Sequence, residues 1–146
     1  LSAVLGRTEL IDVDPSLNST HGGNPICCAA TLASLEVLED ENLIHESARK
    51  GLLLEKELIK IKNKYPDRIN ISGKGLVFAI HVKKFGKKEY DVEIVDRIIE
   101  KSMQKGVLLI RTGTGTIKIG PPLTIFDDAL LEGVSVIDES ISECFS

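Results

Sequence analysis

The chain has 146 residues, of which 42% are hydrophobic, 27% charged and only 4% aromatic, and its formal net charge is −4. This length and composition suit a compact domain with a sizeable core and disfavour a disordered chain. The acidic balance and the few aromatic rings argue against a nucleic-acid-binding surface. No apolar run approaches the roughly 20 residues that span a bilayer. We therefore expect neither nucleic acid nor membrane as a partner.

The three cysteines are Cys27, Cys28 and Cys144. Their odd number and the lack of a C-x-x-C spacing predict neither a disulfide framework nor a zinc site. We interpret them as small buried side chains of a protein in a reducing, cytoplasmic compartment, and we expect no metal.

The chain opens on an apolar run, residues 1–5, typical of a buried strand. Because no Met precedes this run, we expect the chain to be a fragment of a longer protein. After one helical turn over 7–11 and a polar loop, a helix is predicted from Pro25 to about Asp40, with Asn24 as its N-cap. Apolar residues occupy most sides of this helix, so we expect it to be buried almost all round.

From residue 42 onward, helical periodicity alternates with pairs of short strands. The predicted helices are 43–65, 92–105 and 127–143, and the predicted strands are 69–72, 76–82, 107–110 and 116–119. This order favours an α+β layer, in which helices cover a small, mostly antiparallel sheet. Residues 1–41 do not fit that layer. We therefore expect two domains, 1–41 and 42–146, with the first belonging to a different core.

Residues 19–25 combine two hydroxyls, a histidine, two glycines, an asparagine and a proline directly before the predicted helix. Ser19 and Thr20 offer hydroxyl donors, and Gly22 and Gly23 let the backbone approach a ligand closely. A helix N-terminus favours negative charge, so a phosphate suits this loop. A purely structural loop is the alternative, and the residues alone leave it open.

Lys118 lies in a predicted strand just before Gly120-Pro121-Pro122. It faces either water or a cleft in which it would meet a carboxylate. The basic stretch 83–88 is interpreted as a solvated turn, and His45 and His81 as structural. His21 is either a base or, as we favour, a side chain that packs within its loop. The sequence offers no paired carboxylates, no Ser-His-Asp set and no metal cluster, so composition and spacing alone name no reaction.

Several motifs, taken together and in order, resemble the class III pyridoxal-phosphate aminotransferases, which include ornithine and 4-aminobutyrate aminotransferases. The resemblance covers the full length of the chain, and the loop Thr20-His21-Gly22-Gly23-Asn24-Pro25 is its most specific part. The other motifs are residues 1–7, 30–43, 73–76, 106–108 and 119–125.

The resemblance implies a fold-type I transferase that works as a homodimer with its sites at the subunit interface. Residues 1–41 would be the tail of the large cofactor-binding domain, and 42–146 the small C-terminal domain. Thr20 would hold the phosphate of pyridoxal 5'-phosphate in the neighbouring subunit, assisted by Ser19. The parent enzyme would transfer an amino group from an amino acid or ω-amine to a 2-oxo acid.

In this family the lysine that carries the cofactor lies upstream of the position of Leu1, and none of Lys50, Lys74 or Lys118 matches it. The resemblance therefore implies no catalytic residue in this chain, which we expect to be inactive alone. Lys118 stands where the family often has a substrate-binding arginine, and Ser72 also replaces an arginine. These exchanges leave open an amino-acid racemase of the same family, and the missing cofactor lysine leaves open a non-catalytic interaction module. Arg111 is a conjectural substitute for the missing arginine at 118.

Overall fold

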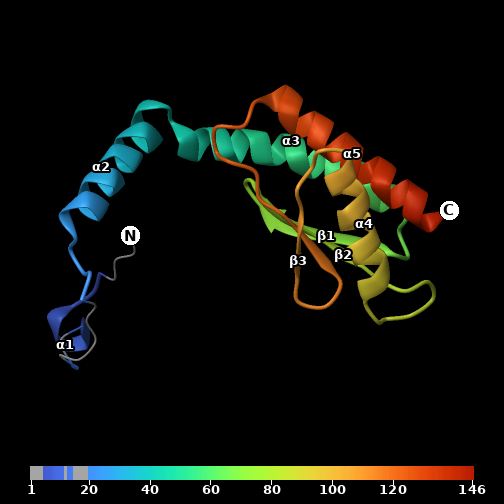
Figure 1. Ribbon diagram of the computed structural model, residues 1–146, viewed down its shortest axis with the longest axis horizontal. Helices are drawn as coiled ribbons and strands as arrows, with labels where there is room; N and C mark the ends of the chain where they lie inside the picture. The colour runs from blue at the N-terminus through green and yellow to red at the C-terminus, as the bar shows by residue number, and fades with distance from the viewer. Residues whose placement is uncertain (1–4, 12, 15–19) are drawn as a thin grey trace. The chain divides into compact units, whose positions relative to one another are not determined.

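The computed structural model describes residues 5–11, 13–14 and 20–146 (Figure 1). The chain divides into two compact units, Leu1–Leu43 and Ile44–Ser146. The predicted strand over residues 1–5 lies outside the described residues except for Leu5, which is exposed and belongs to no strand.

The first unit contains two helices, α1 (Thr8–Ile11) and α2 (Pro25–Asp40), at the predicted positions. The predicted cap is confirmed, because Asn24 Oδ1 accepts hydrogen bonds from the Ile26 and Cys27 amides at 3.0 and 3.4 Å. The prediction that α2 is buried all round is wrong for this chain, since α2 buries none of its residues and Ile26 is 81% exposed. Cys27, predicted to be buried, is exposed for the same reason.

The second unit holds the predicted succession of helices and strand pairs. Its elements are α3 (Leu43–Lys64), β1 (Ile69–Lys74), β2 (Val77–Val82), α4 (Val92–Gln104), β3 (Ile110–Thr112), β4 (Thr116–Ile119) and α5 (Asp127–Phe145). The strands form one sheet in the order β1-β2-β4-β3, and all neighbours are antiparallel. The predicted small antiparallel sheet is therefore confirmed (Figure 1).

The sheet has one buried and one open face, because successive side chains of a strand point to opposite sides. The buried face carries apolar side chains that pack with those of α3, α4 and α5 in a single core. Its strand members include Ile69, Phe78, Ile80, Val82, Ile117 and Ile119, and its helix members include Leu54, Leu58, Ile61, Val95, Ile98, Leu130, Val134, Ile137 and Ile141. The opposite surface, here called the open face, carries Ser72, Ala79, His81, Thr116 and Lys118.

The third strand lies later in the chain than the sequence predicts. We expected it over 107–110, but β3 begins at Ile110 and pairs with β4 from Ile110 opposite Lys118 to Thr112 opposite Thr116. The tight turn at residues 113–115, in which Gly113 and Gly115 have positive φ, determines this register. Residues 107–109 lead into the strand without pairing.

Helix α3 approaches the turn between β1 and β2 so closely that no side chain fits between them. A Cβ atom added to the buried Gly51 would lie 2.5 Å from the carbonyl oxygen of Gly75 and 2.6 Å from its Cα. Gly75 itself has φ +58°, the left-handed region that favours glycine. These two glycines therefore set the distance between helix and sheet.

Two ionic clusters tie the helices together. Arg49 of α3 donates two hydrogen bonds of 2.7 and 2.8 Å to the carboxylate of Asp127, at the start of α5. Lys101 and Lys105 of α4 each lie 2.6 Å from the carboxylate of Glu143 on α5. The hydrogen bonds from Lys101 and Lys105 lower the pKa of Glu143 from 4.5 to about 2.

The Glu143 cluster predicts a specific loss of stability in acid. A carboxyl group whose pKa is lower in the folded state stabilises the fold above its unfolded pKa of 4.5, and this stabilisation is lost as pH falls towards about 2. We expect Glu143→Gln to lower the urea midpoint at pH about 6 and to have a smaller effect at pH about 3. The matched control is Glu132→Gln on the same helix, which should change neither midpoint. A Glu143→Gln effect equal at both pH values would contradict the prediction.

Candidate functional site

The hydroxyl-bearing turn predicted to bind an anion stands directly before α2. Thr20 is exposed there, whereas Ser19 lies outside the described residues. Gly23 has φ +68°, a conformation that side chains other than glycine's rarely adopt. The turn closes with a hydrogen bond of 3.2 Å from the Asn24 amide to the His21 carbonyl oxygen.

The start of α2 limits how an anion can be held. The Ile26 and Cys27 amides, which face the end of the helix, already donate to Asn24 Oδ1. An anion at this turn would therefore be held by the Thr20 hydroxyl and by the positive end of the helix dipole, rather than by those two amides. This donor set fits one side of a phosphate site and supplies no acid, base or nucleophile of its own.

Lys118 lies on the open face of the sheet. It sits in β4 between Ala79 of β2 and Ile110 of β3, and its side chain is exposed. No ion pair engages its ammonium group among the residues that the structure describes. The charge is therefore available to a ligand that approaches this face.

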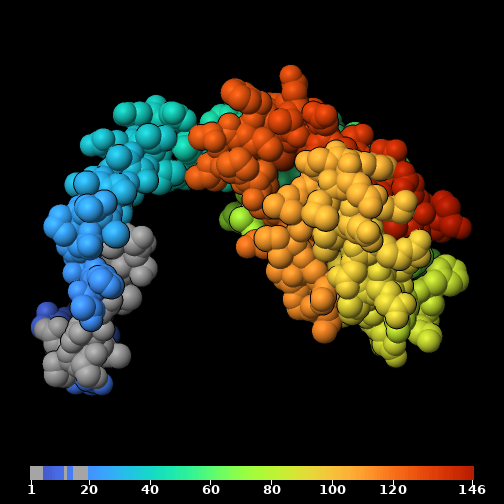
Figure 2. Space-filling view, viewed as in Figure 1, coloured from blue at the N-terminus to red at the C-terminus, as the bar shows by residue number. Residues whose placement is uncertain are grey.

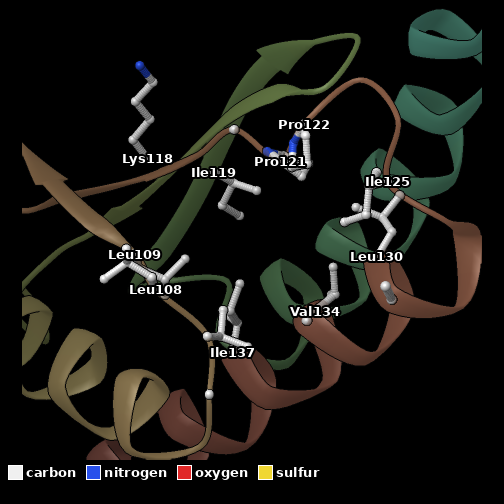
Figure 3. Close-up of a pocket in the computed structure, with 15 residues that line it drawn as sticks. Leu108, Leu109, Lys118, Ile119, Pro121, Pro122, Ile125, Leu130, Val134 and Ile137 are labelled. Atoms are coloured by element: carbon white, nitrogen blue, oxygen red, sulfur yellow. The ribbon is translucent and has the colours of Figure 1, made fainter.

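A cavity of about 420 Å³ lies beside the end of β4. Apolar side chains dominate its lining, among them Leu109, Ile119, Pro121, Leu130, Val134 and Ile137. Lys118 contributes to the rim, but Figure 3 shows its side chain pointing away from these residues. The cavity can bury an apolar group, and none of the described side chains that line it is titratable except Lys118, which points away (Figure 3).

Arg111 lies on the opposite face of the sheet from Lys118. It lies opposite Ile117 in the sheet, on the face that carries the helices, whereas Lys118 lies on the open face. Its guanidinium group donates a 2.7 Å hydrogen bond to Asp96 and a 3.3 Å bond to the Gly113 carbonyl oxygen. This position does not support the conjecture that Arg111 compensates for the exchange.

The open face also holds a hydrogen-bonded chain that the sequence analysis missed. Ser72 Oγ lies 2.8 Å from His81 Nε2, and His81 Nδ1 lies 3.0 Å from Thr116 Oγ1. Three strands contribute one residue each, so the chain depends on their register. Alternating polar residues in the predicted strands were the available signal, but they do not reveal which residues stand opposite each other.

The lysines other than Lys118 occupy structural or solvated positions. Lys50 is buried, and its ammonium group donates a 3.1 Å hydrogen bond to the Leu123 carbonyl oxygen. Lys74 is exposed at the end of β1. Within the described ranges, no three His, Cys, Asp or Glu residues gather to hold a metal, and no helix is long and apolar enough to cross a membrane.

Solved structures that resemble this chain include aminotransferases. Acetylornithine aminotransferase from Elizabethkingia anophelis superposes with a TM-score of 0.81 and 32% identity, over 95% of this chain and 34% of that chain. A Bacillus anthracis aminotransferase gives a TM-score of 0.80 and 28% identity, over 86% of this chain and 30% of that one. The chain therefore has the architecture of one part of an aminotransferase.

The chain belongs to the family Aminotransferase class-III, whose sequence pattern matches residues 1–141. The 5-aminovalerate aminotransferase DavT of Pseudomonas putida is 35% identical over 98% of this chain and 35% of its own length. The 4-aminobutyrate aminotransferase GabT of Escherichia coli is 34% identical over 99% of this chain and 34% of its own. The resemblance seen in the sequence is confirmed, and the chain spans about a third of the length of these relatives.

Proposed function

We propose that this chain is the C-terminal part of a pyridoxal-phosphate-dependent aminotransferase that moves an amino group from an amino acid or ω-amine to a 2-oxo acid. The observation that carries the proposal is the family match along residues 1–141, which includes both the Thr20 turn and the Lys118 strand. Relatives named for 5-aminovalerate and 4-aminobutyrate support an ω-amino donor. We further propose a cytoplasmic, fold-type I homodimer with sites at its interface.

In this proposal the two predicted domains have separate roles. Residues 1–41 are the tail of the large cofactor-binding domain, and 42–146 form the small C-terminal domain. Pyridoxal phosphate supplies an electron sink that labilises bonds at the amino-bearing carbon of the substrate. Thr20, with Ser19, donates hydrogen bonds to its phosphate in the neighbouring subunit. The exposed hydroxyl of Thr20 beside a helix start supports this role.

Lys118 is proposed to bind the substrate carboxylate from the open face. Its ammonium group is exposed, and β4 is hydrogen-bonded on both sides, so the backbone that carries Lys118 is fixed. A lysine presents a point charge rather than the planar fork of an arginine. The expected recognition is therefore charge pairing with one carboxylate, with less control over its orientation.

Transamination by chains of two lengths tests the function. A form extended at its N-terminus to the length of the relatives should convert 4-aminobutyrate only when both pyridoxal phosphate and a 2-oxo acid are present. The 146-residue chain alone should show no turnover, because it contains no residue proposed to carry the cofactor. Turnover by the 146-residue chain, or inversion of an amino acid by the extended form without a 2-oxo acid, would contradict the proposal.

In the extended form, Thr20→Val should raise the pyridoxal phosphate concentration for half-maximal activity about 10- to 100-fold. That range corresponds to the loss of one hydrogen bond to a charged group. Thr31→Val on α2 is the matched control, because Thr31 Oγ1 donates within the helix to the Cys27 carbonyl oxygen. An equal effect of the two substitutions would indicate a general loss of helix stability and would contradict the phosphate contact of Thr20.

A further inference from the structure

The connection between β2 and α4 ends in a basic tip, defined as residues 84–88, with the sequence Lys-Phe-Gly-Lys-Lys. All five residues are exposed, and Phe85 is 77% exposed. Gly86 at the apex has φ +68°. Figure 1 shows this yellow-green connection extending away from β2 and the start of α4, and Figure 2 shows it at the edge of the molecule in the same view. The tip thus presents an aromatic ring and several ammonium groups to solvent together.

Backbone hydrogen bonds hold the basic tip in shape. The Lys84 amide donates to the Glu89 carbonyl oxygen at 2.9 Å, and the Lys87 amide donates to the Lys84 carbonyl oxygen at 3.1 Å. Directly before and after the tip, the backbones of Lys83 and Tyr90 pair in an isolated antiparallel β-bridge. Because the turn is already closed, binding through it orders little additional backbone.

Positive charge dominates around the basic tip although the whole chain is acidic. Lys83 and the three lysines of the tip outnumber the exposed carboxylates of Glu89 and Asp67, and the nearby Asp91 is paired with Arg68 at 3.3 Å. Glu89 lies 3.6 Å from the Lys84 ammonium group, but both side chains are exposed and such pairs contribute little. Asp67 borders the same surface hollow as Phe85, Lys87 and Lys88. The tip therefore attracts anionic surfaces.

We propose that the basic tip is a peripheral contact with an anionic phospholipid surface. Phe85 enters the boundary between headgroups and acyl chains, while the flanking lysines pair with lipid phosphates and carboxylates. One aromatic anchor beside a basic cluster suits such a surface. Nucleic acids are usually bound through several stacking rings and arginines, and the tip offers one ring and only lysines. This proposal departs from our expectation, based on the lack of a spanning segment, that membranes are not partners.

Fluorescence at the tip tests the contact directly, because the chain contains no tryptophan. Phe85→Trp places a single indole at the apex of the full chain. Its emission should shift to the blue with vesicles of phosphatidylcholine containing about 30% phosphatidylserine, and not with pure phosphatidylcholine. The shift should disappear as NaCl rises from about 0.02 M to about 0.5 M. The added salt shortens the Debye length and so screens the attraction between the lysines and the anionic headgroups.

Lysine variants measure how much the charge contributes. Each lysine near an anionic surface adds roughly a fivefold increase in partitioning, so Lys84→Gln/Lys87→Gln/Lys88→Gln should weaken vesicle binding about a hundredfold. The matched control, Lys56→Gln/Lys60→Gln/Lys74→Gln, changes the net charge equally at exposed positions away from the tip. It should keep most of the binding.

Three outcomes would overturn the proposal. The first is an equal loss of binding in the tip and control variants, which would indicate a response to net charge alone. The second is vesicle binding without a blue shift at position 85, which would place the contact elsewhere. The third is binding of single-stranded RNA through the same lysines in the absence of vesicle binding, which would identify a different partner.

Discussion

Gly51→Ala is expected to destabilise the second unit by about 3 kcal/mol, at the upper end of the usual range for overpacking. The added methyl group would meet the backbone of Gly75 at 2.5 to 2.7 Å, and backbone cannot turn away as a flexible side chain can. Alanine also favours a helix over glycine by about 1 kcal/mol, so the observed loss is net of that gain. Urea denaturation followed by far-UV circular dichroism measures the change.

The matched control is Gly133→Ala in α5, since among the described residues no atom outside the adjacent turns of α5 lies within 4 Å of a Cβ added there. This second helical glycine should therefore give a stabilisation of roughly 0.5–1 kcal/mol from helix propensity alone. If both substitutions stabilised the chain, the close approach of α3 to the β1–β2 turn would be refuted.

Lys118→Ala in the N-terminally extended form is expected to lower kcat/KM for 4-aminobutyrate about 10- to 100-fold. This range corresponds to the loss of one charged hydrogen bond to the substrate carboxylate. Lys118→Arg should retain or improve kcat/KM, because the guanidinium fork can grip both carboxylate oxygens.

An ω-amine of similar length without a carboxylate provides the control for the lysine variants. Its kcat/KM should change little, because Lys118 would have no anion to bind. The folded state should also be unaffected, since the side chain is exposed and engages no ion pair within the described residues. An equal loss with both donors would show that Lys118 supports the fold or the cofactor rather than the carboxylate.

The helices and the sheet class were predictable because their signals are local. Helix α2 begins at Pro25 behind an asparagine cap, and α4 has a clear apolar stripe that ends before Gly106. Strand β3 was placed too early because residues 107–110 are as apolar as a strand. The pairing of β3 depends instead on the turn at 113–115 and on its partner β4. The hydrophobicity of residues 107–110 alone contains no information about that pairing.

The candidate site was only partly predictable from the sequence. Composition indicated a hydroxyl-bearing turn at Thr20, but it could not show that Asn24 uses the Ile26 and Cys27 amides. The opposite orientations of Lys118 and Arg111 follow from strand register rather than residue type. The exposure of α2 could not be predicted either. The sequence of an apolar helix is the same whether or not another element packs against it.

The strand order has a practical consequence for studying the substrate. Strand β4 lies inside the sheet, hydrogen-bonded to β2 on one side and β3 on the other. Replacing the side chain at position 118 should therefore leave the backbone at that position unmoved. A series of side chains there with increasing reach (serine, glutamine, lysine, arginine) can therefore serve as a molecular ruler. Plotted against the chain length of the amino donor, their activities would report how far the carboxylate lies from the sheet.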